Sequence, residues 1–274
     1  MKSTQTLLFL FVLIACWLSA TPAQAHGDLH DAIAGVSHAI AGAPGDASLF
    51  LRRAELHRLH RDFAAAEADY AKAAELQPNL AEVQFGLASL RLAQGRPQAA
   101  LHLLDDFLAA SSRHPEGYAL RAELLEKQGA WKKADADLAA AVASSTEPHY
   151  ATKRAQLLER HGEPEAAIRC LDEASRAHGR VPLLEQQALE LEERAGKTEA
   201  VLHRLDDLIV REPRSDIWLA RKARALASWG RAEDATLAWR EAAAAFAKIP
   251  LEKRNLAINR ELAAEIEANQ VRLR

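Results

Sequence analysis

The 274-residue sequence predicts an all-α protein built as a solenoid of repeated helical hairpins. Three observations predict this fold class. Helix-favouring Ala, Leu, Glu and Arg dominate, whereas aromatic residues make up only 5% of the chain and β-branched residues are few. Five glycines recur at a nearly constant interval, at positions 95, 129, 162, 196 and 230. Apolar residues of fixed size recur at fixed offsets from these glycines, as expected when one supersecondary unit is repeated.

The repeat keeps one register over six units. The glycines lie 34, 33, 34 and 34 residues apart, and Arg61, 34 residues before Gly95, takes the glycine position of the first unit. A mostly small residue stands seven positions before each of these markers: Ala54, Ala88, Ala122, Ala155, Leu189, Ala223. Another stands five positions after it: Ala66, Ala100, Ala134, Ala167, Val201, Ala235. A large apolar residue follows four positions later: Tyr70, Leu104, Leu138, Leu171, Leu205, Trp239.

This register has the physical logic of a helical hairpin. A glycine just past the end of the first helix adopts the left-handed conformation without the steric cost that a Cβ brings. Proline at 97 and 164 suits the first turn of the second helix, where its missing amide is not needed. Small residues let the paired helices approach closely, and the large residue fills the seam. One hairpin leaves its apolar side exposed, so it is stable only against its neighbours.

The same residues resemble the tetratricopeptide repeat. Its pattern of apolar, small, Ala, aromatic and terminal Pro positions is matched by LFLRRAELHRLHRDFAAAEADYAKAAELQP, Leu49 to Pro78, and similar blocks begin at Tyr118 and Trp218. The resemblance covers residues 45–247 and implies a right-handed superhelix of about six hairpins whose first helices line a concave groove. It departs from the family around Leu189, Gly196 and Val201, where larger residues predict a wider helix spacing.

The two ends of the solenoid are expected to carry capping helices. Within residues 26–44, an apolar stripe of Leu29, Ile33, Val36 and Ile40 follows Asp28, a candidate N-cap. Residues 248–274 place Leu251, Leu256, Ile258, Leu262 and Ile266 among many charges and predict a closing helix, with a partner-binding tail as the alternative. Such caps cover the terminal apolar faces of a solenoid.

Residues 1–25 have the layout of a secretory signal peptide. Lys2 precedes an apolar run from Leu7 to Leu18, and Ala23 and Ala25 form a small-residue cleavage site. The apolar run is shorter than the roughly twenty residues that span a membrane, so we predict its removal and no membrane span. Export to the bacterial periplasm follows, with a lipoprotein anchored through Cys16 as the alternative.

No motif of enzyme chemistry appears in the chain. It lacks a phosphate-binding Gly-rich loop, a His-Glu-x-x-His pair and a Gly-x-Ser-x-Gly turn, so we expect no enzyme. The net charge of −3 is small and mixed in sign, which argues against nucleic acid. Cys170 lies beside Leu171 with no placed base, so it is expected to be a buried hydrophobe rather than a nucleophile.

The resemblance implies a partner-binding groove on the first helices. Carried onto this chain, the groove positions are Glu55, Arg58, Glu123, Glu126, Glu159, Arg160, Glu190, Glu193, Arg194 and Arg224. Their acidic excess predicts a protein or peptide partner with a basic segment, although charged helix faces often serve solubility alone. The predicted function is therefore a non-enzymatic protein-protein interaction scaffold of the bacterial cell envelope.

The alternative function is an envelope metal-binding accessory protein. Cleavage after Ala25 would give His26 a free α-amine beside its imidazole, a chelating pair suited to Cu(II). This terminus resembles the copper-binding end of histidine-brace proteins in that one residue. His30 can add a ligand, and His57 and His60 share a helical face. No other cofactor is expected.

Overall fold

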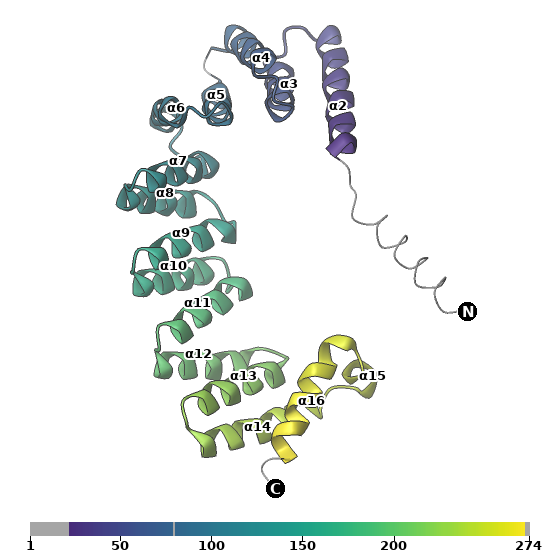
Figure 1. Ribbon diagram of the computed structural model, residues 1–274, viewed down its shortest axis with the longest axis vertical. Helices are drawn as coiled ribbons and strands as arrows, with labels where there is room; N and C mark the ends of the chain where they lie inside the picture. The colour runs from purple at the N-terminus through teal and green to yellow at the C-terminus, as the bar shows by residue number, and fades with distance from the viewer. Residues whose placement is uncertain (1–21, 79, 272–274) are drawn as a thin grey trace, which may run out of the picture. The chain divides into compact units, whose positions relative to one another are not determined.

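The computed structural model describes residues 22–78 and 80–271, and this part of the chain forms fifteen helices and no strand. Successive helices alternate in direction along the chain (Figure 1). The helices are α2 Pro22–Gly42, α3 Ala47–Leu59, α4 Phe63–Leu76, α5 Ala81–Ala93, α6 Pro97–Ala110, α7 Pro115–Lys127, α8 Trp131–Ser144, α9 Pro148–Arg160, α10 Pro164–Ala177, α11 Pro182–Arg194, α12 Thr198–Arg211, α13 Ser215–Ser228, α14 Ala232–Phe246, α15 Leu251–Arg254 and α16 Ala257–Val271. The predicted all-α fold of helical hairpins is confirmed.

The turn inside each hairpin is made as the sequence predicts. The five marker glycines all have φ between 67° and 80°. Arg61 has φ 65°, so it adopts the glycine conformation despite its Cβ. Pro97 and Pro164 lie in the first turn of α6 and α10, and Pro115 and Pro182 begin first helices in the same way.

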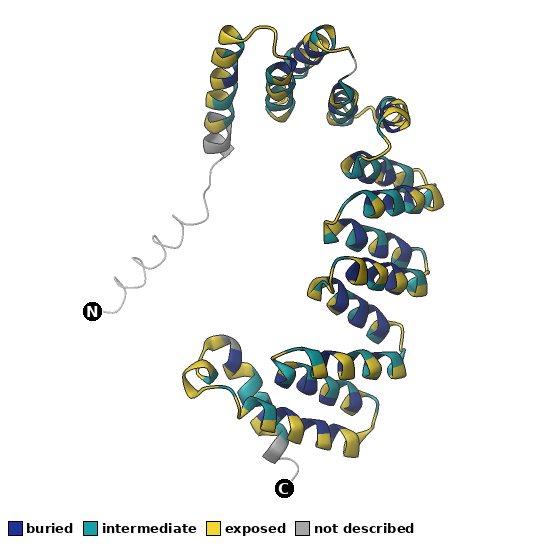
Figure 2. Cartoon of the chain, turned by 180° about the vertical axis from the view of Figure 1, so that it is seen from behind, coloured by how far each residue is buried: buried dark blue, intermediate teal, exposed yellow. Residues whose placement is uncertain are grey.

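The core of the chain runs between neighbouring hairpins, as Figure 2 shows by the dark stripes on facing helices. Every residue of the two small-residue columns and of the large apolar column is at most 5% exposed. The apolar clusters are local: one joins α3, α4 and α5, and another joins α13, α14 and α16. Each helix pair is therefore stabilised by its sequence neighbours, as expected of a solenoid.

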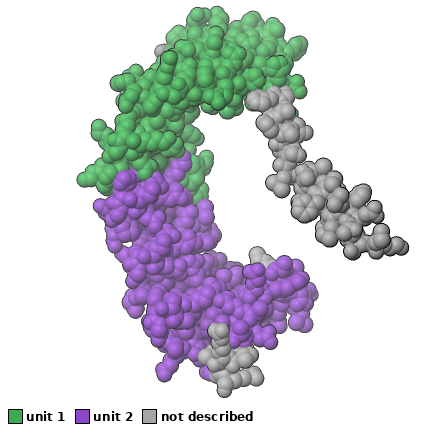
Figure 3. Space-filling view, viewed as in Figure 1, with its two compact units in different colours: residues 1–150 green, residues 151–274 purple. Residues whose placement is uncertain are grey.

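The chain divides into two compact units, residues 1–150 and 151–274, coloured separately in Figure 3. The first unit holds α2 to α8 and the second holds α10 to α16 with most of α9. None of the helices in the described ranges is long and apolar enough to cross a bilayer.

Helix α2 packs on α3 in the way that the second helix of one hairpin packs on the first helix of the following hairpin. Val36 is buried, 34 residues before Tyr70, and the next residue, Ser37, accepts a hydrogen bond from Arg53 Nη1 at 3.1 Å. Arg121 of α7 makes the same contact to Asp105 of the preceding helix, α6, also in the first unit.

The prediction that Asp28 is an N-cap is wrong. Helix α2 begins at Pro22, so Asp28 lies inside it. Residues 1–21, including Cys16, and the side chain of His26 lie outside the described residues.

The C-terminal segment contains two helices. The short helix α15 ends at Arg254, with Asn255 as its C-cap, and α16 then packs against α14 and α13. Ile266 is 4% exposed in the cluster around Trp239, with Leu262 beside it, whereas Leu251 and Leu256 are exposed. Asn259, which is buried, ties α16 to the start of α13 by accepting a hydrogen bond from Arg214.

Candidate interaction surface

The predicted groove residues lie on first helices, and the structure brings three of them together. Glu159 of α9 and Glu190 and Arg194 of α11 line a hollow of about 220 Å³ in the second unit. Thr152 Oγ1 donates a hydrogen bond to Gln187 Oε1 at 2.8 Å across the same pair of helices. These two polar residues were not distinguishable in the sequence, since nothing in the repeat register marks them.

Several of the groove carboxylates are already paired within the protein. Glu159 Oε1 lies 2.9 Å from Arg194 Nε, and Glu193 receives two hydrogen bonds from Arg221, at 3.0 and 2.8 Å. Glu190 instead accepts a hydrogen bond from the neutral amide of Gln186. The net negative charge of the first-helix face of the second unit is therefore smaller than its number of acidic residues indicates. Among the described residues, no cation is paired with Glu190.

The groove residues of the first unit lie on α3 and α7. Glu55 accepts hydrogen bonds from Arg58 and from the buried hydroxyl of Tyr70, so it fastens α3 to α4. Burial and the neighbouring Glu55 raise the pKa of Tyr70 above its ordinary value, which keeps the hydroxyl a donor. Glu123 is exposed and Glu126 half-buried on α7. Glu55 thus has a structural role that its sequence position did not reveal.

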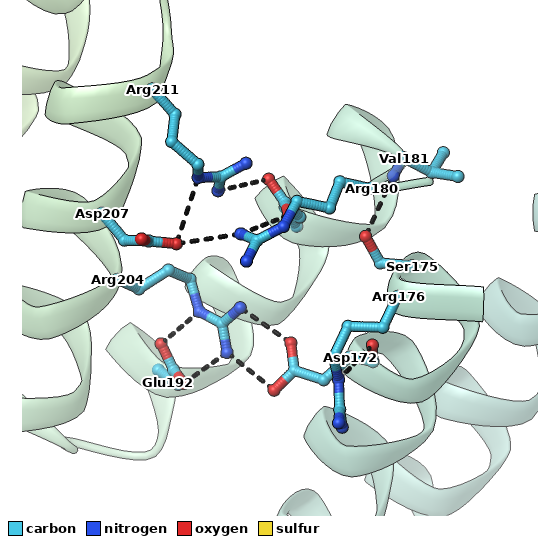
Figure 4. A network of polar contacts seen from close by, with 10 residues as sticks. Asp172, Ser175, Arg176, Arg180, Val181, Glu192, Arg204, Asp207 and Arg211 are labelled. Carbon is cyan, nitrogen blue, oxygen red and sulfur yellow. Dashed lines mark hydrogen bonds and ion pairs between the residues drawn. The ribbon is translucent and has the colours of Figure 1, made fainter. Parts of the chain in front are cut away.

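Charged residues also surround a hollow on the second-helix side of the second unit (Figure 4). It has a volume of about 510 Å³ between α10 and α12, over α11. Arg204 lies at its centre and bonds both Glu192 and Asp172 at 2.7 to 3.0 Å. Burial lowers the pKa of Arg204, but these bonds outweigh burial and hold the pKa above its ordinary value.

A second part of this network closes the rim of the same hollow. Arg211 bonds Glu185 at 3.0 Å and Asp207 at 3.1 Å, and Arg180 reaches Asp207 at 3.1 Å. Burial raises the pKa of Asp207, but Arg180 and Arg211 outweigh it and lower the pKa. Helices α11 and α12 approach each other less closely than the helices of the pairs α3–α4, α5–α6, α7–α8 and α13–α14 do, in line with the wider spacing predicted at Leu189 and Val201. The network bridges this looser region.

The histidines converge only in part. The rings of His30 on α2 and His60 at the end of α3 have centroids 6.1 Å apart. Among the described residues, no group of three or more His, Cys, Asp or Glu is placed to hold a metal ion. Cu(II) binding at His26 and His30 therefore stays a prediction. Cys170 is 5% exposed, as predicted, and its thiol lies 3.9 Å from the carbonyl oxygen of Ala151.

Sequence comparison agrees with the hairpin geometry. Residues 85–148 match the tetratricopeptide repeat family. The matched segment begins in α5 and ends at the start of α9, so it contains two tetratricopeptide hairpins. A search of curated proteins found no match.

Solved structures extend the tetratricopeptide likeness along the chain. The C-terminal part of a tetratricopeptide repeat-containing protein from Cytophaga hutchinsonii has a TM-score of 0.55 at 11% identity, covering 81% of this chain and 92% of that chain. A tetratricopeptide protein from Parabacteroides merdae gives 0.45 at 16%, covering 88% and 93%. PilF of Pseudomonas aeruginosa gives 0.47 at 15%, covering 80% and 97%. The Cytophaga likeness supports the tetratricopeptide fold beyond the matched residues.

Proposed function

We propose that this protein is a non-enzymatic scaffold of the bacterial cell envelope that binds a basic segment of a protein partner along its first helices. The observation that carries the proposal is the hollow between α9 and α11, where Glu159 and Glu190 face a space of about 220 Å³. Carboxylates held on rigid helices attract Lys and Arg and favour fast association. Tetratricopeptide proteins generally serve as interaction scaffolds, which fits residues 85–148.

Charge reversal at this hollow tests the proposal. The double variant Glu159→Lys/Glu190→Lys should weaken capture of the envelope partner about fivefold or more at low salt, because the attractive charge of Glu190 becomes repulsive and Arg194 loses the neutralising carboxylate of Glu159. The difference should shrink at high salt, where exposed charges are screened. The measurement is the dissociation constant of the captured partner at two salt concentrations, with helicity checked by circular dichroism.

A matched control separates the groove from overall charge. Glu173→Lys/Glu261→Lys makes the same change in net charge at exposed positions on α10 and α16. This control should bind the partner like the parent. If the two double variants bind the partner equally well, the first helices are not the contact surface.

Export is the second part of the proposal. The leader at residues 1–25, with its cleavage site at Ala25, supports a periplasmic location. We expect the intact mass of the protein isolated from cells to correspond to a chain that begins at His26. A chain beginning at a lipid-modified Cys16 would make the protein a lipoprotein, and a mass that includes Met1 would overturn export by this route.

A further inference from the structure

A second hollow lies on the second-helix side of the second unit, between α12 and α14 with α13 as its floor. Its volume is about 570 Å³, larger than the 220 Å³ of the first-helix hollow. The residues that line it are Glu199, Leu202, His203, Asp206, Lys222, Leu226, Arg231, Asp234, Leu237, Ala238 and Glu241. All of them come from one compact unit.

The floor of this hollow is apolar because two residues of the repeat have changed. It is the same place, one repeat later, as the hollow that contains the Arg204 network. Leu226 stands 34 residues after Glu192, and Ala238 stands 34 residues after Arg204. The ion pair on the floor of the earlier hollow, which has a volume of about 510 Å³, is thus replaced by a leucine and a methyl group, at 2% and 3% exposure. The floor therefore changes from charged to apolar.

The rim combines an exposed apolar side chain with carboxylates. Leu237 is 57% exposed, in the place that His203 takes one repeat earlier. Four carboxylates line the hollow against two cations, Lys222 and Arg231. Lys222 is 2.5 Å from Asp206, and Arg231 is 2.7 Å from Asp234.

The two remaining acids give the rim its negative charge. The Glu199 side chain is 88% exposed and lies 3.8 Å from Arg231, which is already bound to Asp234. Glu241 is exposed, and none of the ion pairs within residues 28–269 involves it. An apolar floor with a net acidic rim is complementary to an apolar side chain flanked by cations.

We propose that this second-helix hollow is a docking site for a basic amphipathic segment of a protein partner. One large apolar side chain of the segment packs on Leu226, Ala238 and Leu237, and flanking Lys or Arg side chains pair with Glu199 and Glu241. The site is separate from the first-helix hollow between α9 and α11, because none of the residues that line it belongs to either of these helices. Failure of one site therefore leaves the other intact.

Direct mapping with a defined probe tests the site. The probe is a helical peptide of about 14 residues made of Leu and Lys, with the leucines on one face. Leucine methyl spectra of the chain from His26 to Arg274 are recorded while the peptide is added. We expect saturable shifts at Leu202, Leu226 and Leu237, with a dissociation constant on the order of 10 μM. Shifts confined to α9 and α11, or no binding, would overturn the proposal.

The affinity of the peptide for variants of the hollow gives a quantitative test. Leu226→Glu/Ala238→Arg transplants the Glu192–Arg204 pair of the preceding repeat and should replace the apolar floor with an ion pair, weakening peptide binding about tenfold or more. Leu237→Ser removes an exposed side chain, so it leaves the fold intact, and should weaken binding severalfold. Val210→Ser is the control, because Val210 is 85% exposed on α12 outside the hollow. Equal binding by Leu237→Ser, Val210→Ser and the parent would show that the peptide binds elsewhere.

Discussion

Gly86→Ala is expected to destabilise the first unit by about 1 to 3 kcal/mol, although alanine is the better helix former. Gly86 is buried in α5 against the Tyr70 ring of α4. A Cβ at Gly86 would overlap Cε1 of that ring and lie 2.7 Å from Cζ. Tyr70 cannot move away easily, because it is fully buried and its hydroxyl is bound to Glu55. The measurement is the free energy of opening of α4 and α5 by native-state hydrogen exchange.

Two further variants make this test specific. Gly35→Ala, within α2, is the matched control, since no atom lies within 4 Å of a Cβ at that position. It should stabilise α2 by about 0.5 to 1 kcal/mol. Tyr70→Leu places the smaller residue of the repeat beside position 86, so Gly86→Ala should cost much less in that background. An equal cost in both backgrounds would mean that the Tyr70 ring is not what opposes the methyl group.

Arg204→Met is expected to destabilise the second unit by about 3 kcal/mol, because it leaves buried carboxylates without their counter-charge. The Glu192 side chain is 7% exposed and Asp172 31% exposed, and both are bound by the same guanidinium. Thermal unfolding and hydrogen exchange of α10 to α12 measure the loss. Arg176→Met is the control, because Arg176 is exposed and bonds the Asp172 backbone carbonyl of its own helix. It should change stability little.

The neighbouring repeat supplies a rescue for this variant. Glu192→Leu/Arg204→Ala copies the Leu226 and Ala238 pair found 34 residues later. Removing both charges should recover a large part of the stability that Arg204→Met loses, because no fully buried carboxylate then remains. A double variant that is as unstable as Arg204→Met would show that the guanidinium acts by filling space rather than by pairing charge.

The hairpin register could be predicted from the sequence because it depends on residues whose size and backbone preference are fixed. A small residue such as Ala66 or Ala134 lets two helices approach closely, and both of these alanines are fully buried. Even Arg61 was correctly placed at the glycine position, because the spacing outweighs the preference of one residue. The spacing of residues along the sequence is therefore enough to predict the hairpin register.

The surfaces were less predictable, because they depend on which long side chains meet across helices. Glu193 and Arg221 are 28 residues apart, and the sequence alone does not show that they pair. The apolar floor of the hollow between α12 and α14 arises because Leu226 and Ala238 replace the Glu192 and Arg204 of the preceding repeat, which becomes visible only when equivalent positions of the two repeats are compared in space. The predicted binding of metal by His26 and His30 is untested.

The packing of α2 has a consequence for how the length of this chain can change during evolution. Because α2 meets α3 through the contact that α6 makes with α7, α2 is in register with the second helices of the hairpins. A duplication of 34 residues at this junction would insert a hairpin whose two faces already match their new neighbours. Length can therefore change in whole hairpins while each existing seam is conserved. A duplication that differs by several residues from a whole number of repeats would place the residues equivalent to Arg53 and Ser37 on different faces and break the seam.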